Sequence, residues 1–303
     1  MTAHSTVTID FSFTEHLARL RVALEHRLDV LLPPASSERD LVLTAMRESA
    51  LAPGKRMRPL LLMLTAEGLG ACEQPALELG CAVEMVHAAS LVLDDMPCMD
   101  NARLRRGRPT THLTFGEDVA ILAAIALLSR AFALVASIDS VPAAVRAQLV
   151  TLLANAIGTQ GLVKGQFQDL REGVQPRTAD EIAATNTLKT GVLFSAIMDM
   201  ACLIGDATPQ VRGALQAFAL ELGQAFQLYD DLCDHDPGSG KDQGKDDGKS
   251  TFMALCGEAK VRERLKGHLQ RAQQQLGQAF ECDVPIGRFL RIIFAKAAPA
   301  NPL

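Results

Sequence analysis

Apolar residues recur along this chain at spacings of three and four positions, which is the period of a buried helix face. One example runs from Leu20 through Leu24 and Leu28 to Leu31. Few stretches alternate apolar and polar residues as strands do, and proline or glycine breaks the pattern into segments of about 12 to 30 residues. Only 4% of the residues are aromatic, so alanine and leucine must fill the core, which favours helices over a sheet sandwich. We therefore expect ten or more helices.

The whole chain, residues 1–303, is predicted to form a single all-α domain. No internal repeat divides it, and 48% apolar against 21% charged residues is enough for a sizeable core. The one low-complexity stretch is 236–249, DPGSGKDQGKDDGK. It is too short for a domain linker, so we predict that it is a mobile lid.

The charge and cysteine content indicate which classes of partner and which cell compartment to expect. The net charge is −5 and no basic arm is present, which argues against a nucleic-acid partner. Seven cysteines without a CxxC pair indicate reduced thiols in the cytoplasm, and the N-terminus lacks the pattern of a signal peptide. The apolar stretch 119–138 is long enough for a membrane span, but Arg130 within it and Asp118 and Asp139 beside it favour a buried helix. We expect no membrane span.

A first group of aspartates ends an apolar segment in SLVLDDMPCMDN. It consists of Asp94, Asp95 and Asp100. Pro97 interrupts the helix there and allows the chain to bring Asp100 back beside Asp94.

A second group, Asp230, Asp231 and Asp234 in FQLYDDLCD, also ends an apolar segment. Asp230 and Asp234 are four residues apart and would lie about 6 Å from each other on one helix face. Either group alone is equally well explained as a solvated helix end. However, acidic residues at a helix C-terminus oppose the helix dipole, so two such groups indicate a compensating cation. Carboxylate oxygens without histidine or cysteine suit Mg²⁺, which also binds phosphates and water.

Basic residues of the kind that bind phosphates occur in several groups, each of which taken alone is explained by surface charge. In chain order they are Lys55, Arg56, Arg58, Arg105, Arg106, Arg108, Lys189, Lys241, Lys245 and Lys249. The first three follow Pro53–Gly54 at a predicted helix start, where free backbone N–H groups also favour an anion. His87 precedes Asp94 by two helical turns and shares nearly the same face, although a lone histidine is usually structural.

Together these motifs resemble the trans-isoprenyl diphosphate synthases, from about Gly54 to Thr251. The matching segments, in the order of the family, are GKRMRP, HAASLVLDDMPCMDNARLRRGRPT, GQFQDL, KTG, FQLYDDLCD and GKST. The form DDMPCMD is most similar to bacterial geranylgeranyl diphosphate synthases of carotenoid biosynthesis. Ala102 and Arg103 stand where many farnesyl diphosphate synthases have two further aspartates, but the three aspartates of the first group are intact.

The resemblance implies an all-α fold with helices around a deep central cavity, usually as a homodimer. It also implies head-to-tail prenyl elongation, in which an allylic diphosphate loses pyrophosphate and the allylic cation is attacked by the double bond of isopentenyl diphosphate. Metal ions and basic side chains would neutralise the leaving diphosphate, and an apolar cavity would protect the cation from water.

The motifs also carry residue roles, as the resemblance implies them. The principal Mg²⁺ ligands would be Asp94, Asp100 and Asp230, for three ions bound with the diphosphate, and Asp95, Asp231 and Asp234 would act through water or as hydrogen-bond acceptors. The allylic diphosphate would be held by Arg105, Lys189, Thr190, Gln227 and Lys241. Isopentenyl diphosphate would be held by Lys55, Arg58, His87 and Arg106. Lys249 would close with the lid, and Gln166 and Asp169 would line the cavity.

Three other readings remain. A farnesyl diphosphate synthase would use the same residues and stop at C15. A terpene cyclase would ionise the same kind of substrate, but it needs no second substrate site and typically mixes Asn, Ser or Thr with Glu in its second metal motif. A non-catalytic partner subunit would be expected to have lost aspartates or basic ligands.

Product length depends on the residues below the first aspartate group. Ser90 lies about 6 Å below Asp94 on nearly the same helix face, and Ala89 is slightly deeper. Family members that stop at C15 tend to carry bulky aromatic residues at these positions. Val83, about 16 Å below Asp94, could help to floor a longer cavity. The small Ala89 and Ser90 predict a C20 product, geranylgeranyl diphosphate.

Overall fold

The computed structural model describes residues 11–173, 175–233, 250–280 and 284–295. Within these residues the helices are α1 (Phe11–Leu31), α2 (Leu41–Leu51), α3 (Met57–Gly68), α4 (Glu73–Asp94), α5 (Thr111–Phe115), α6 (Glu117–Ala136), α7 (Ala143–Ile157), α8 (Leu162–Glu172), α9 (Ala179–Asn186), the π-helical turn η1 (Thr187–Gly191), α10 (Val192–Ile204), α11 (Pro209–Cys233), α12 (Phe252–Ala279) and α13 (Pro285–Phe294). The prediction of an all-α fold with ten or more helices is confirmed.

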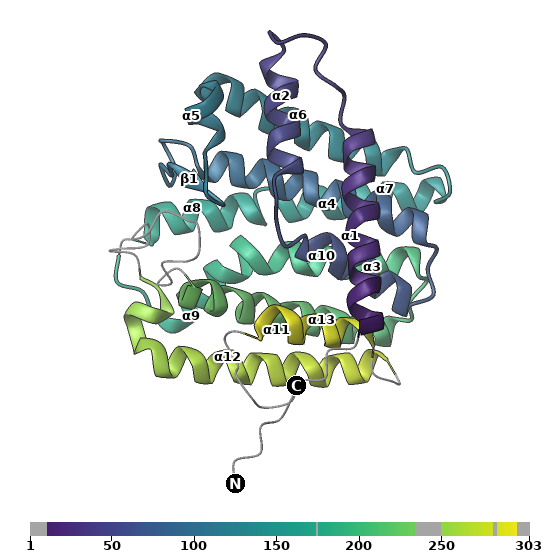
Figure 1. The fold of residues 1–303 in the computed structure, drawn as a ribbon. Coiled ribbons are helices and arrows are strands. Elements are labelled where there is room, and N and C mark those ends of the chain that lie inside the picture. Colours follow the sequence, from purple (N-terminus) through teal and green to yellow (C-terminus); the bar gives the residue numbers. More distant parts are fainter. Residues whose placement is uncertain (1–10, 174, 234–249, 281–283, 296–303) are drawn as a thin grey trace.

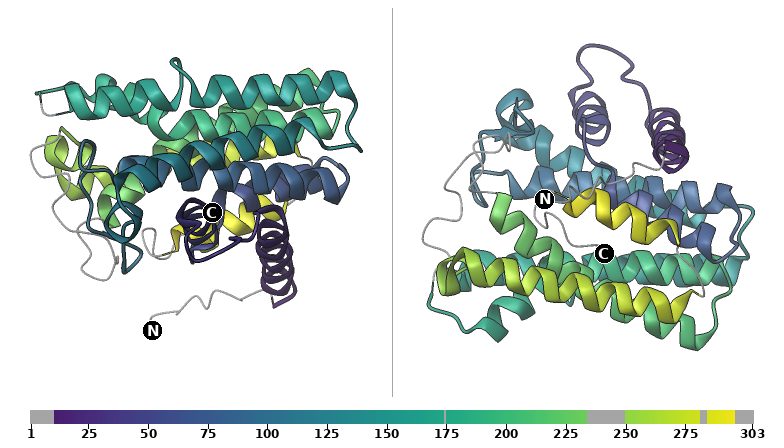
Figure 2. Two further views of the ribbon diagram at one scale, coloured as in Figure 1. Left: turned by 90° about the horizontal axis from the view of Figure 1, so that it is seen from above. Right: turned by 60° about the horizontal axis from the view of Figure 1, so that its bottom comes forward.

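The helices are arranged as a layered bundle. In Figure 1, α4, α6, α8, α10, α11 and α12 run roughly side by side, and α1 and α2 run across them at the front. Both views of Figure 2 place α1 and α2 (purple) at one side of the remaining helices. The core lies where α3, α4 and α10 meet, and α6 and α11 pack around these three.

Local sequence explains where several helices begin. Asp40 precedes α2 and its carboxylate accepts a hydrogen bond from the backbone N–H of Leu43. Thr178 and Glu181 form a capping box at the start of α9, in which each side chain satisfies a backbone donor of the other residue. Pro142 immediately precedes α7, as expected for a residue that cannot donate within a helix. Asp40, Pro142 and Thr178 therefore set the starts of α2, α7 and α9.

A short hairpin between α4 and α5 is an element that the apolar spacing did not predict. Strands β1 (Leu104–Arg105) and β2 (Arg108–Pro109) pair in antiparallel fashion. The two turn residues, Arg106 and Gly107, have φ values of 55° and 75°, as a type I′ turn requires. Strands of two residues are too short for an alternating pattern, so only the RRGR sequence marks the turn.

Among the described residues, three helical stretches are long and apolar enough to cross a membrane by length and composition alone, and the most apolar parts of these three are 72%, 44% and 61% buried inside the structure. They are α4, α6 and the continuous stretch Ala179–Ile204. The predicted apolar segment 119–138 corresponds to α6, the least buried of the three. The absence of a membrane span stays a prediction.

Candidate active site

The first aspartate group closes the C-terminal end of α4. Asp94 is the last residue of the helix, and the chain then turns back through Pro97. The backbone N–H of Asp100 donates to the carbonyl oxygen of Asp94 at 2.9 Å, and that of Ala102 donates to Asp95 at 3.2 Å. The return of Asp100 to Asp94, predicted from the proline, is therefore confirmed.

Burial makes the charges of Asp94 and Asp95 unfavourable without a cation. It raises the pKa of Asp94 to about 6, and although Lys189 and Arg105 oppose the shift, Asp100 and Asp95 add to it. Burial also raises the pKa of Asp95, against the effect of the Arg105 guanidinium. Arg105 donates to both oxygens of the Asp95 carboxylate, with Nη2 2.5 Å from Oδ1 and Nε 3.2 Å from Oδ2. Asp95 is thus neutralised by the protein, whereas the half-buried Asp94 carboxylate gains most from a metal ion.

The second aspartate group is tied to the KTG segment by a chain of hydrogen bonds. The Thr190 hydroxyl donates to Gln227 Oε1 at 3.2 Å, and Gln227 Nε2 donates to Asp231 Oδ1 at 3.0 Å. Asp231 is buried and Asp230 is half-buried on α11. Asp234, Lys241, Lys245, Lys249 and the predicted lid 236–249 lie outside the described residues.

Glycines allow η1, which carries Lys189 and Thr190, to lie between α8 and α11. A Cβ atom on Gly165 would come within 2.3 Å of the Lys189 backbone nitrogen, and one on Gly223 within 2.7 Å of the Gly191 Cα. Lys189 Nζ donates to Asp169 Oδ2 at 2.7 Å. Burial opposes the charge of Lys189, but Asp169, Asp94 and Asp100 outweigh it and raise its pKa. The sequence placed Asp169 in the cavity wall without indicating this ion pair.

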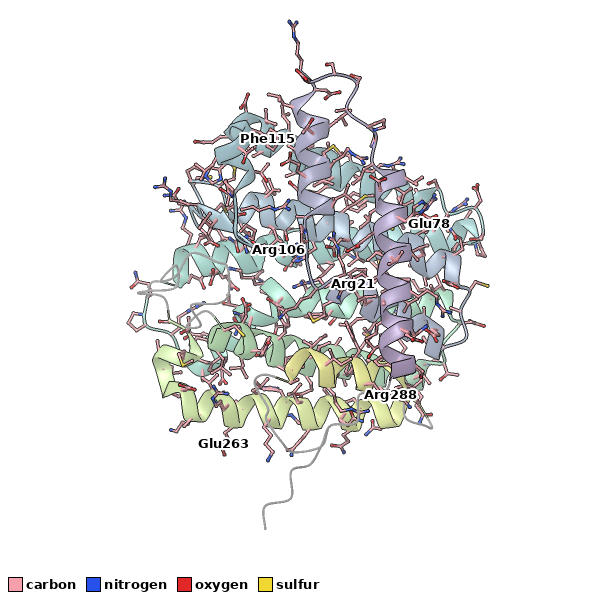
Figure 3. The ribbon with its side chains drawn as sticks, in the orientation of Figure 1. Arg21, Glu78, Arg106, Phe115, Glu263 and Arg288 are labelled. Atoms are coloured by element: carbon pink, nitrogen blue, oxygen red, sulfur yellow. The ribbon has the colours of Figure 1, made fainter. Side chains whose placement is uncertain are left out.

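The predicted isopentenyl diphosphate residues gather where α3 begins beside α4. Arg58 Nη1 lies 3.4 Å from His87 Nε2, and Arg106 donates to the carbonyl oxygen of Pro53 at 2.9 Å. Arg106 is labelled near the centre of the view in Figure 3. Burial lowers the pKa of His87 well below its usual value, and Arg58 and Arg106 lower it further. His87 is therefore neutral at pH 7, and because arginine can only donate, its Nε2 accepts from Arg58.

Arg56 is held inside the protein, which differs from the ligand-binding role predicted for its neighbours Lys55 and Arg58. Its side chain is 1% exposed, and its Nη1 lies 2.5 Å from Oε1 of the equally buried Glu84 on α4. The same guanidinium donates to the carbonyl oxygen of Ala50 at the end of α2. The residue has a φ of 49°, which turns the chain into α3. Arg56 thus fixes the start of α3, which Lys55 precedes and which carries Arg58.

We expect Arg56→Met to lower the free energy of unfolding by about 3–5 kcal/mol, because it leaves Glu84 charged and unpaired in the core. Arg56→Met/Glu84→Leu should regain most of that loss, since it removes both buried charges. Arg146→Met is a matched control, because its pair with the exposed Asp139 at 3.8 Å should contribute less than about 1 kcal/mol. Urea unfolding measures all three, and a double variant no more stable than Arg56→Met would contradict this role.

The residues predicted to set product length lie on α4 below Asp94. Ala89 and Val83 are fully buried, and Ser90 is half-buried with its hydroxyl donating to the His87 carbonyl oxygen at 2.9 Å. Gln166 of α8 approaches the first aspartate segment, with Nε2 4.0 Å from Met99 Sδ. Its Oε1 is buried and has no hydrogen-bond partner. These positions agree with a site that extends from the aspartates into the bundle.

The carboxylates suit a metal that shares its coordination with a ligand. In the part of the chain that the structure describes, no three His, Cys, Asp or Glu side chains are grouped closely enough to hold a metal ion by themselves. The donors are all oxygens, and Asp100 lies close enough to Asp94 to add to the rise that burial causes in the Asp94 pKa. Mg²⁺ is typically bound by one or two carboxylates together with phosphate and water, so these residues fit it.

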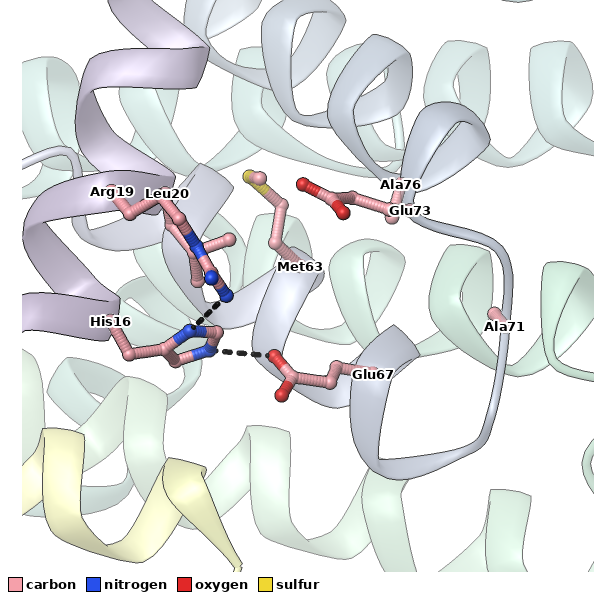
Figure 4. A pocket seen from close by; sticks show the side chains of 8 residues that line it. All are labelled: His16, Arg19, Leu20, Met63, Glu67, Ala71, Glu73 and Ala76. Carbon is pink, nitrogen blue, oxygen red and sulfur yellow. Dashed lines mark hydrogen bonds and ion pairs between the residues drawn. The ribbon is translucent and has the colours of Figure 1, made fainter. Parts of the chain in front are cut away.

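A separate pocket of about 210 Å³ lies between α1, α3 and α4. Figure 4 shows His16, which hydrogen-bonds to Glu67 at 2.9 Å and accepts from Arg19 at 2.8 Å. Glu67 stands near the C-terminus of α3 and Glu73 at the N-terminus of α4. The first aspartate group, at the C-terminal end of α4, and Arg58, at the N-terminal end of α3, occupy the opposite ends of these helices, so this pocket is distinct from the candidate active site.

Comparison with known proteins agrees with this arrangement. The sequence pattern described as polyprenyl synthetase matches residues 39–283. A geranylgeranyl diphosphate synthase of Pantoea ananas is 52% identical over 292 residues, which cover 94% of this chain and 96% of that protein. A farnesyl diphosphate synthase of Geobacillus stearothermophilus is 38% identical and covers 90% and 93% of the two chains. The crystal structure of an FPP/GFPP synthase from Zymomonas mobilis has a TM-score of 0.83 at 32% identity and covers 95% and 99%. This chain belongs to the polyprenyl synthetase family.

Proposed function

We propose that this protein condenses isopentenyl diphosphate head-to-tail with an allylic diphosphate to give geranylgeranyl diphosphate and pyrophosphate. Farnesyl diphosphate is the main allylic substrate, and dimethylallyl and geranyl diphosphate are further primers. The observation that carries the proposal is the placement of two aspartate groups and two sets of cations around one region. Lys189 opposes the rise that burial causes in the pKa of Asp94. Asp230 likewise opposes the fall that burial causes in the pKa of Arg58, so each cation lies near an aspartate of the site. The names of the relatives at 52% and 49% identity support the C20 product.

In this mechanism the side chains bind two diphosphates and exclude water. Bound Mg²⁺ would neutralise the charge that develops on the leaving diphosphate. Lys189 and Arg105 hold the allylic diphosphate, while Arg58 and Lys55 hold isopentenyl diphosphate so that its double bond faces the allylic carbon. The carbon–oxygen bond breaks, the new carbon–carbon bond forms, and the departing pyrophosphate accepts the proton that is lost. Buried small residues such as Ala89 leave apolar surroundings for the growing tail.

Three Mg²⁺ ions are proposed to bind with the diphosphate. The chemistry of the donors supports Mg²⁺, because Asp94, Asp100 and Asp230 offer only carboxylate oxygens. Asp95, Asp231 and Asp234 are proposed to act through water molecules or hydrogen bonds. Lys241 and Lys249 are proposed to reach the diphosphate from the lid.

The half-saturating Mg²⁺ concentration should rise as the pH falls through about 6. A proton then competes with the metal for Asp94, whose pKa burial raises to about 6. In the metal-free protein a fall in pH has the opposite effect and raises the stability, because desolvation favours the protonated form of Asp94. The stabilisation from protonated Asp94 is complete below the ordinary pKa of 3.8 and is lost as the pH rises through about 6. Activity titrations with Mg²⁺ and metal-free thermal melts, both between about pH 5 and 8, test both signs. Melts of Asp94→Asn should lack this pH dependence, and an unchanged dependence would contradict the assignment.

The protein is also proposed to be a cytoplasmic homodimer built from a single domain over residues 1–303, without a membrane span and without a nucleic-acid partner, and to serve carotenoid biosynthesis. An apolar stripe on the outer face of α6 supports self-association. Ile121, Leu122 and Ile125 there are 42%, 51% and 54% exposed. Side chains of this size at the spacing of one helix face are typical of a contact between subunits.

We expect Ile125→Glu to convert the dimer into a monomer, because it buries a charge in the proposed contact. Sedimentation velocity measures the change. Ile292→Glu on α13 is a matched control, since Ile292 is 53% exposed on a different helix and should leave the association state unchanged. If both variants remained dimeric, the contact would lie elsewhere, and a monomeric wild-type protein would exclude the homodimer.

Pyrophosphate release tests the proposed reaction. The purified protein is incubated with Mg²⁺ and each allylic diphosphate, with and without isopentenyl diphosphate. Prenyl elongation requires both substrates. Release from the allylic substrate alone, with a hydrocarbon or alcohol as product, would instead indicate a terpene cyclase. No turnover under any combination would favour the non-catalytic partner subunit.

A further inference from the structure

Two cations of the proposed isopentenyl diphosphate site rest on aromatic rings. The ammonium nitrogen of Lys55 lies 5.2 Å from the centre of the Tyr229 ring. The guanidinium carbon of Arg58 lies 5.1 Å from the centre of the Phe194 ring and 5.6 Å from that of Phe226. All three distances fall within about 6 Å, the range in which the negative face of a ring attracts a cation.

These rings are fixed by their own packing. Phe194 of α10 is fully buried and meets Phe226 of α11 edge to face, with centres 5.8 Å apart. Tyr229, one turn further along α11, is 4% exposed and meets Phe294 of α13 in the same manner at 5.2 Å. The ring faces are therefore held in place by three helices, independently of any ligand.

The cations in and around the site are held in two different ways. Arg56 is paired with Glu84, Arg105 with Asp95 and Lys189 with Asp169, at distances of 2.5 to 2.7 Å. In the described ranges, Lys55 and Arg58 have no ion pair, and Arg58 Nε is buried without a hydrogen-bond partner. A carboxylate would neutralise these cations and occupy their N–H donors. An aromatic face attracts a cation while leaving its charge and its donors available to an anion.

We propose that Phe194 and Tyr229 are positioning residues, which hold Arg58 and Lys55 in place for the diphosphate of isopentenyl diphosphate without neutralising them. This role rests on the proposed function, because it assigns that diphosphate as the ligand. It predicts that loss of a ring affects this substrate and not the allylic one, whose cations Arg105 and Lys189 are held by carboxylates.

The test is steady-state kinetics of the full-length protein with Mg²⁺. Phe194→Leu and Tyr229→Leu should each raise the KM for isopentenyl diphosphate by about three- to thirtyfold, the range expected for one cation–ring contact. The kcat and the KM for the allylic diphosphate should stay near the wild-type values. Tyr229→Phe keeps the ring face and should behave like the wild type. If Phe194→Leu fails to fold, Phe194→Met replaces it, since methionine has a similar size and no ring.

A double-mutant cycle separates positioning from general packing. If Phe194 acts through the guanidinium, Phe194→Leu should add nothing to the KM for isopentenyl diphosphate in an Arg58→Gln background. Phe252→Leu is the matched control, because the Phe252 ring lies 4.9 Å from Arg264, a cation outside the proposed site. It should lower the thermal stability and leave both KM values unchanged.

Three results would overturn the proposal. They are an unchanged KM for isopentenyl diphosphate in both leucine variants, an equal factor for Phe194→Leu with and without Arg58, and an equal rise in Phe252→Leu. In each case the wild-type enzyme still condenses its substrates. A wild-type protein that releases no pyrophosphate in response to isopentenyl diphosphate would instead reject the proposed function itself.

Discussion

Asp94→Ala and Asp230→Ala should each lower turnover by about three orders of magnitude, because each removes a ligand of a metal ion that neutralises the leaving diphosphate. We do not expect either substitution to destabilise the fold. Burial opposes the charge of Asp94, so its removal should leave the thermal stability of the metal-free protein unchanged or raise it. Initial rates at saturating Mg²⁺ and metal-free thermal melts measure the two effects.

Asp139→Ala is the control for these variants, since the Asp139 side chain is fully exposed in the loop after α6. It should change neither the rate nor the melting temperature. Near-normal turnover in Asp94→Ala or Asp230→Ala would mean that the metal ligands are assigned wrongly. A large loss of metal-free stability would mean that the aspartates serve the fold.

Ala89→Phe should change the main product from C20 to C15. Ala89 is fully buried one turn below Asp94 on α4, and a phenyl ring there would fill the upper part of the space for the growing tail. The condensation should continue, because the aspartates and both sets of cations are untouched. Chromatography of the dephosphorylated products separates the two chain lengths.

A thermal melt checks that Ala89→Phe has folded, because an added ring in a packed core can also cost about 1–3 kcal/mol. Total incorporation of labelled isopentenyl diphosphate shows whether the chemistry is preserved. A folded, active variant that still makes mainly the C20 product would show that the tail does not pass Ala89.

Local sequence predicted much of the fold because helices leave local signals. The spacing of Leu20, Leu24 and Leu28 corresponds to the buried face of α1, and the break at Pro142 lies just before α7. The turn at Pro97 follows from the geometry of proline alone. The hairpin at Arg106 was not predicted, since two-residue strands are too short for a periodic pattern.

The motifs predicted the charged residues of the site but not what holds them. Nothing in the sequence distinguishes Glu84 from other residues of an apolar helix, and only the fold brings it next to Arg56. Phe194 and Tyr229 lie far from Arg58 and Lys55 in the sequence, and the packing of α3 against α10, with α11 on α10, makes the contacts. A single sequence contains no signal for such pairs, because each partner has an adequate local explanation as core or as surface.

The product of the wild-type protein tests the central claim most directly. The full-length protein is incubated with Mg²⁺, labelled isopentenyl diphosphate and, in separate reactions, dimethylallyl, geranyl and farnesyl diphosphate, and the dephosphorylated products are separated by chromatography. We expect the C20 alcohol as the final product, formed most rapidly from farnesyl diphosphate. Elongation that ends at C15, with no use of farnesyl diphosphate as a primer, would contradict the claim and identify a farnesyl diphosphate synthase.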